Sequence, residues 1–513
     1  MKKSTSRTIN SRNNFVTGMI AQILVLIMGF ICRTIFIDVL GKQYLGVNNA
    51  FTDIIGLLSL TELGLGTAIL YQLYKPIATE DNDRIYVLMK FYKQAYQLIG
   101  VSVIVIGLLI LPFLTFLIKK DLPPNLNIYL IFLLYLGQSA STYFFFAYKS
   151  AIIRANQQSS VIYTFDWWFT IASNLLQILE LLFIGSFELY VAITIVTNAV
   201  ENLLIARKSD QLFPFLKEKR TAKISWEEAK KIIKDCYALS LWKINSVLIS
   251  TTDNLCLTVF MGFGVVGVYS NYQLLRMNVG KFLDRFYTAI TASIGNLNAT
   301  KADRNLQVYR VTNFVTSIMY GITGLGFYFV ANPFIRMWLN KDYILSDLTV
   351  LLLAIDMYVS GINKLSNTYR SALGLFNYMK YRPLLGSAVN IVVSVWLVQS
   401  MGVAGVVIGT IACKFLIYFW FEPLIIYRYG FHKNPLPFYI KNLGYMVMWG
   451  GLALAIHYST QFLSYSSLLL LLVRGSLSVI VPLAVIWLLF GRSYEMKYLK
   501  ANVLNKLFKR FKT

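Results

Sequence analysis

Long apolar runs recur along the whole chain and limit what it can fold into. They span about 18 to 25 residues each between Phe15 and Phe490, the length that a helix needs to cross the hydrocarbon core of a bilayer. Hydrophobic residues make up 57% of the 513 residues and charged residues only 14%. That balance excludes a soluble globular domain of this size. The sequence therefore predicts an all-α, polytopic membrane protein.

Loop charges and breaks in hydropathy divide the runs into about fourteen transmembrane helices. With the N-terminus inside, most Lys and Arg residues of the connections fall on the inner side, as the positive-inside rule requires. Both termini are therefore expected to be cytoplasmic. The expected spans are 15–38, 44–73, 90–118, 126–148, 160–184, 187–206, 237–260, 264–290, 308–338, 345–370, 383–399, 402–426, 438–459 and 467–490.

The formal net charge of +24 follows mainly from this topology, so we expect no nucleic-acid partner. Four cysteines are scattered through apolar segments and two histidines lack ligand-spaced partners. We therefore expect no disulfide framework, no metal site and no cofactor. The basic start "MKKSTSRTINSRNN" precedes a long apolar run, which favours a first permanent span over a cleaved signal peptide.

The chain repeats itself at an offset of 221 residues. "LGKQYLGVNNAF" (40–51) aligns with "MGFGVVGVYSNY" (261–272), which matches Gly41 to Gly262 and Gly46 to Gly267. Six spans separate the copies, so both have the same membrane orientation and a pseudo-symmetry axis along the membrane normal. The expected organisation is an N-lobe of six helices (1–206), a cytoplasmic amphipathic linker (207–236), a C-lobe of six helices (237–430), two further helices (431–490) and a basic cytoplasmic tail (491–513).

Several segments resemble a known transporter family. They are "FIDVLGKQYLGVNNAFTDIIGLLSLTELGLGTAILYQLYKPIATEDNDRIYVLMKFYKQAYQLIG" (36–100), "YRSALGLFNYMKYRPLLGSAVNI" (369–391) and "GVAGVVIGT" (402–410). These segments are similar to bacterial polysaccharide flippases, the Wzx-type repeat-unit translocases of the MOP superfamily. The resemblance implies a MATE-like fold in the bacterial plasma membrane. It also implies a cargo of undecaprenyl-pyrophosphate-linked oligosaccharide, which moves from the inner to the outer leaflet for capsule or exopolysaccharide synthesis. Lipid II flippases and multidrug antiporters are related alternatives, and other polysaccharide-assembly proteins are implied partners.

The span 264–290 carries charges at a depth where each is costly. Arg276, Lys281 and Arg285 lie on the polar side of its helical wheel, and fixed cations could replace part of the lost hydration of a pyrophosphate. They are candidate substrate-binding residues, joined by Arg33 in the first span and Lys364 in "SGINKLSN". Structural alternatives stay open, since Lys281 could pair with Asp284, and Arg276 with Asp53 or Asp253. We expect Asp166, Glu180, Asp356 and Lys414 to make structural pairs or lie near the interface.

The energy source is not fixed by the sequence. No phosphate-binding loop motif occurs, so we expect no nucleotide-driven pump. Coupling to H⁺ or Na⁺ would need a carboxylate within the membrane, for which Asp53, Glu62 and Asp253 are candidates. The alternative from another class is a membrane polymerase or glycosyltransferase. The outward loops are short and no nucleophile–histidine pair is evident, so we expect no enzyme and no catalytic residues.

Overall fold

The computed structural model describes residues 2–58, 65–117, 122–123, 126–144, 146–218, 224–300, 302–375, 378, 381–461 and 468–501. Over these residues the chain is built of helices and contains no strand. It divides into two compact units, Met1–Gly267 and Val268–Thr513. The all-α prediction is therefore confirmed.

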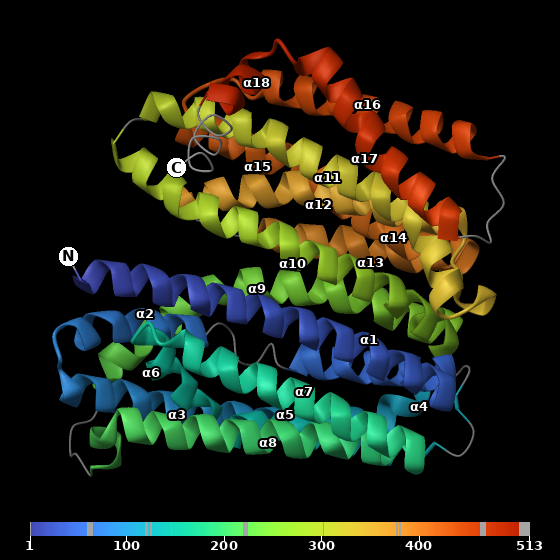
Figure 1. The fold of residues 1–513 in the computed structure, drawn as a ribbon. Coiled ribbons are helices and arrows are strands. Elements are labelled where there is room, and N and C mark those ends of the chain that lie inside the picture. Colours follow the sequence, from blue (N-terminus) through green and yellow to red (C-terminus); the bar gives the residue numbers. More distant parts are fainter. Residues whose placement is uncertain are drawn as a thin grey trace. The chain divides into compact units, whose positions relative to one another are not determined.

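Unit 1 holds long helices that lie side by side (Figure 1). The helix pairs α1–α7, α3–α5, α7–α8 and α1–α9 pack closely, and the polar side chains described below lie between them. The elements are α1 (Lys2–Leu58), α2 (Leu65–Ala78), α3 (Asn82–Ile110), η2 (Leu111–Phe113), α4 (Leu114–Leu117), α5 (Ile128–Phe144), η3 (Ala147–Lys149), α6 (Ser150–Ala155), α7 (Ser159–Phe183), α8 (Phe187–Leu212), η4 (Pro214–Lys217) and α9 (Trp226–Met261).

Unit 2 is centred on the closely packed pairs α11–α12, α13–α14 and α12–α14, with α17 against α11. Its core is rich in aromatic residues, including the fully buried Tyr309, Tyr369 and Tyr427. The elements are α10 (Phe263–Thr300, which begins in unit 1), α11 (Ala302–Trp338), η5 (Lys341–Tyr343), α12 (Asp347–Ala372), α13 (Arg382–Met401), α14 (Val403–Ala412), the π-helical η7 (Cys413–Phe419), α15 (Trp420–Ile425), the π-helical η8 (Ile426–Gly430), α16 (Leu436–Thr460), α17 (Leu468–Phe490) and α18 (Tyr494–Leu499).

Eight helices within the described ranges are long and apolar enough to cross a membrane, or nine if the bent pair Ile128–Phe144 and Ala147–Ala155 forms one span. These helices define a multi-pass membrane protein. The count of fourteen spans stays a prediction. Helices such as α9 and α10 are long enough to cross a membrane, but they are more polar and are not among these eight.

The repeat seen in the sequence recurs in the backbone. Gly41 interrupts α1 at φ 87° and ψ 178°, and its counterpart Gly262 separates α9 from α10 at φ 91° and ψ 172°. Only glycine adopts this left-handed, extended conformation without steric cost. The same helix break is therefore encoded twice, at equivalent positions of the two copies.

One helix boundary differs from the expectation. The last part of the expected linker (207–236) and the span expected at 237–260 form one continuous helix, α9, which packs on α1 and α2 within unit 1. An N-cap at Ser225, whose hydroxyl accepts from the Glu228 amide at 3.2 Å, starts this helix. The amphipathic stretch is thus the first part of a longer helix, and the linker and lobe boundaries stay predictions.

Candidate functional site

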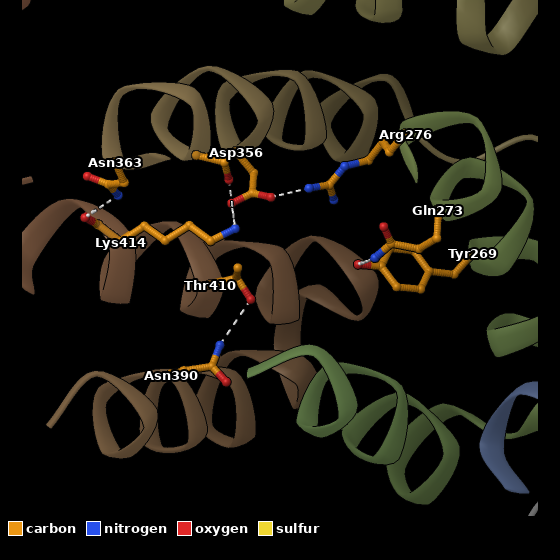
Figure 2. A network of polar contacts seen from close by, with 9 residues as sticks. Tyr269, Gln273, Arg276, Asp356, Asn363, Asn390, Thr410 and Lys414 are labelled. Atoms are coloured by element: carbon orange, nitrogen blue, oxygen red, sulfur yellow. Dashed lines mark hydrogen bonds and ion pairs between the residues drawn. The ribbon is translucent and has the colours of Figure 1, made fainter. Parts of the chain in front are cut away.

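Two cationic side chains of unit 2 meet at one buried carboxylate (Figure 2). Asp356 of α12 is 1% exposed and forms ion pairs with Arg276 of α10 and Lys414 of η7. The Lys414 Nζ donates to Asp356 Oδ1 at 2.6 Å and to Ser360 Oγ at 2.9 Å. The triad carries a formal charge of +1, because two cations share one anion. Desolvated cations of this kind can be stable only with a counter-charge close by.

A second ion pair joins the same two helices further along. Lys364 of α12 contacts Asp284 of α10, and the Lys364 Nζ lies 5.9 Å from the ring centroid of Tyr287. Both pairs, Arg276–Asp356 and Asp284–Lys364, have a sequence separation of 80. The helices therefore run parallel, with two ion pairs of opposite polarity eight residues, or about 12 Å, apart. This arrangement fixes the register of α10 against α12.

The position of Lys414 depends on a π-helical turn. Residues Cys413–Phe419 form the π-helix η7 directly after α14. The Asn363 amide of α12 donates to the Lys414 backbone carbonyl at 3.1 Å (Figure 2). A π-helical turn re-aims side chains relative to a regular α-helix and is often found at functional sites. Both the backbone and the ammonium group of Lys414 are thus held from α12.

The remaining predicted cations are placed differently. Lys281 of α10 is exposed, and Asp284, the neighbour that it could pair with, instead contacts Lys364. Arg33 of α1 is half-buried beside Tyr190 of α8. Arg285 lies in α10, in the part whose side chains lie outside the described structure. The structure therefore brings Arg276 together with Asp356, a partner that the sequence did not suggest.

Two of the predicted carboxylates, Asp53 and Asp253, lie in unit 1. Asp53 of α1 accepts from the Asn254 amide of α9 at 2.5 Å, and the adjacent Asp253 is buried at 6% exposure. Glu62 lies outside the described residues. Asp53 and Asp253 are thus both near the α1–α9 contact, and their role in ion coupling stays a prediction.

A polar cavity of about 350 Å³ lies between α1, α5, α7 and α8. Twelve of its fourteen lining residues have side chains that can form hydrogen bonds, which is unusual within helices of a membrane protein. The lining residues are Asn48, Thr52, Tyr135, Gln138, Phe169, Thr170, Ser173, Asn174, Gln177, Tyr190, Val191, Thr194, Asn198 and Glu201.

Polar residues at helical spacing on α7 and α8 indicate this cavity in the sequence, although the overall composition does not. Thr170, Ser173, Asn174 and Gln177 follow one face of α7 at helical spacing, and α8 repeats the pattern from Thr194 to Glu201. A polar stripe on a membrane helix must face protein or water. Charged residues alone do not reveal the cavity, because these stripes are mostly amides and hydroxyls.

Comparison with solved structures places the fold among membrane transporters. Lipid II flippase MurJ in an inward closed conformation has a TM-score of 0.65 and 13% identity, covering 92% of this chain and 99% of MurJ. An inward-facing multidrug resistance MATE family transporter of the MOP superfamily has a TM-score of 0.60 and 13% identity, covering 78% and 94%. A mutant of the Vibrio cholerae MATE transporter VcmN has a TM-score of 0.58 and 16% identity, covering 84% and 99%.

No family model and no curated protein matches the sequence. At these identities the similarity establishes the fold. The chain is thus a polytopic membrane protein with the architecture of lipid II flippase MurJ and of MATE transporters.

Proposed function

We propose that this protein is a flippase for a lipid-linked oligosaccharide whose lipid is joined to the sugar through pyrophosphate. The main observation in support is the triad of Arg276, Asp356 and Lys414 on helices of a flippase-like fold. Two positive charges face one negative charge there, so an anionic headgroup would find an excess of positive charge. The resemblance of the sequence to polysaccharide flippases supports the same cargo.

The triad suggests how the anion is received. In the empty protein, Asp356 neutralises Arg276 and limits the cost of burying the guanidinium. A phosphate group can accept two parallel hydrogen bonds from a guanidinium and one from an ammonium group. The phosphate groups of the cargo would thus replace part of the negative charge that Asp356 supplies. The Asp356 carboxylate would neutralise the two cations again when the cargo leaves. Arg276 and Lys414 are the proposed ligands, and Asp356 is the proposed counter-ion.

A multidrug antiporter for cations is the main alternative with the same fold. Its cargo would favour an acidic site, whereas the triad is cationic. We assign the proposed flippase to the bacterial plasma membrane, with both termini cytoplasmic and with H⁺ or Na⁺ as the candidate coupling ion.

The test is leaflet-resolved transport by the purified full-length protein in liposomes. The cargo is a fluorescent undecaprenyl-pyrophosphate oligosaccharide, and an external quencher reports movement across the bilayer with and without an imposed proton or sodium gradient. We expect Arg276→Gln and Lys414→Gln each to reduce the transport rate at least tenfold, because each removes a charge-assisted hydrogen bond worth about 1.5–3 kcal/mol. Lys90→Gln on α3, a cation outside the triad, is the matched control and should leave transport unchanged.

Two results would contradict the proposal. One is transport of a cationic dye but not of the lipid-linked oligosaccharide by well-folded protein. The other is unchanged transport of the oligosaccharide when both Arg276 and Lys414 are replaced.

A further inference from the structure

The polar cavity of unit 1 is separate from the ionic triad, and the proposed role of the triad leaves it unexplained. Its walls come from four helices, and the half-buried carboxamides of Gln138, Asn174 and Asn198 reach it from α5, α7 and α8 respectively. Carboxamides both donate and accept hydrogen bonds. Each would be costly to leave unsatisfied inside a membrane. The cavity must therefore be filled by water or by a polar ligand.

The size of the cavity argues against a bare ion. A coordinated cation needs several oxygen atoms within about 2.0–2.6 Å on all sides. A space of about 350 Å³ holds the equivalent of roughly a dozen waters at about 30 Å³ each, so its opposite walls cannot touch one ion. That volume lies instead at the lower end of the range for pockets that bind small organic ligands, about 300–1,000 Å³.

Part of the lining is already held in a fixed geometry. The Gln177 amide donates to Thr194 Oγ1 at 2.8 Å and to the Tyr190 carbonyl at 3.4 Å, which ties α7 to α8. Tyr135 of α5 donates its hydroxyl proton to Asn48 of α1. These bonds cross between helices, so the cavity walls are preorganised. Preorganisation lowers the entropy that binding costs.

The charge and the aromatic content of the lining indicate the class of ligand. No Lys or Arg lines the cavity, and Glu201 is its one acidic lining residue among the described residues. An anionic pyrophosphate would be repelled there. Phe169, Tyr135 and Tyr190 add aromatic rings to the amides and hydroxyls. Hydrogen-bonding groups of both kinds beside aromatic faces complement a neutral ring with many hydroxyl groups.

We propose that this cavity binds one neutral sugar ring of the transported oligosaccharide, with Asn174 and Asn198 as its principal hydrogen-bonding residues. The inference rests on the proposed flippase function. It divides recognition between two sites of different chemistry, a cationic triad in unit 2 for the phosphate groups and an amide-rich cavity lined by no Lys or Arg in unit 1 for a sugar.

The test measures sugar binding directly on the full-length protein in lipid nanodiscs. Saturation-transfer NMR is recorded with methyl glycosides of neutral hexoses and of N-acetylhexosamines. Asn174→Leu and Asn198→Leu keep side-chain size but remove the amide, and they lie on different helices, so folding failure of one leaves the other informative. Loss of two hydrogen bonds is expected to weaken binding by about tenfold or more. Asn202→Leu, the same change on α8 outside the cavity lining, is the matched control.

The proposal holds if the parent protein and Asn202→Leu bind at least one glycoside equally and both cavity variants bind it at least tenfold more weakly. It is overturned if the folded parent protein binds no glycoside, if both cavity variants bind as the parent does, or if the cavity variants change only a response to Na⁺. A parent protein that transports the lipid-linked cargo but binds no glycoside would end this inference and leave the proposed function intact. If the parent protein binds a glycoside, the variants behave as expected and no transport occurs, the sugar-binding cavity is supported and the proposed flippase function is contradicted.

Discussion

The two repeat-related glycines Gly46 and Gly267 make reciprocal backbone contacts, and replacing either by alanine should disrupt them. A Cβ atom on Gly46 would lie 1.9 Å from the carbonyl oxygen of Phe263, and one on Gly267 would lie 2.0 Å from the carbonyl oxygen of Lys42. Lys42 and Phe263 are themselves repeat equivalents, since both lie four residues before a glycine of the pair. The contact is thus pseudo-symmetric within unit 1.

The size of the effect follows from these distances. Ordinary contact begins at 3.4 Å, so the backbones must separate by 3.4 − 1.9 = 1.5 Å for Gly46→Ala and by 3.4 − 2.0 = 1.4 Å for Gly267→Ala. No side-chain rotation can relieve the clash, because the obstructing atoms belong to the backbone. Overpacking of this kind costs about 1–3 kcal/mol, of which the higher helix propensity of alanine offsets up to about 1 kcal/mol.

The assay is thermal unfolding of the purified protein in detergent. We expect Gly46→Ala and Gly267→Ala to lower the unfolding temperature by similar amounts. The double variant should lose less than the sum, because backbones that have parted for one methyl group already accommodate the other. Gly29→Ala and Gly56→Ala are controls, since a Cβ at either position meets nothing within 4 Å.

Unfolding temperatures of Gly46→Ala and Gly267→Ala that match those of the controls would refute the close backbone approach. Strongly unequal losses for the two glycines would refute its pseudo-symmetry.

Two further predictions concern ion pairs. Asp284→Lys and Lys364→Asp together reverse the ion pair between α10 and α12. The double variant should regain the thermal stability that each single substitution reduces, because the register that joins these residues is unchanged. A double variant no more stable than the single variants would contradict that register. In unit 1, the hydrogen bond from Arg84 Nη1 at 2.9 Å lowers the pKa of Glu228, with help from Ser225. This stabilisation is present above the unfolded pKa of about 4.3 and is lost as pH falls through the lower folded pKa. Arg84→Gln should thus lower the free energy of unfolding by roughly 0.2–1 kcal/mol at pH 7. Chemical unfolding should show that this difference from the parent protein shrinks towards about pH 3. A difference that is constant with pH would show that this pair does not contribute.

The sequence by itself determined the class of structure. Hydrophobic runs of membrane-spanning length require helices, because lipid offers the backbone no hydrogen-bond partners. The 221-residue repeat predicted equivalent positions, and the matching backbone angles of Gly41 and Gly262 agree with it. Helical periodicity also showed that α10 has a polar side. Each of these features is visible in residues within a few turns of one another, or in the recurrence of such a segment along the sequence.

The partners of the polar side chains were decided only by the tertiary structure. Periodicity shows which face of a helix is polar, but it does not show which other helix meets that face. Asp356 contacts Arg276 because α10 and α12 run parallel in one register, and Lys414 joins them because η7 is π-helical.

The cavity of unit 1 depended on tertiary structure in the same way. Asn174 and Asn198 are ordinary polar residues in the sequence, and they line one cavity only because α7 and α8 pack together. A helix encodes its own amphipathic face within a few turns. A binding site needs several such faces to meet, and that meeting is settled by the packing of residues far apart in the chain.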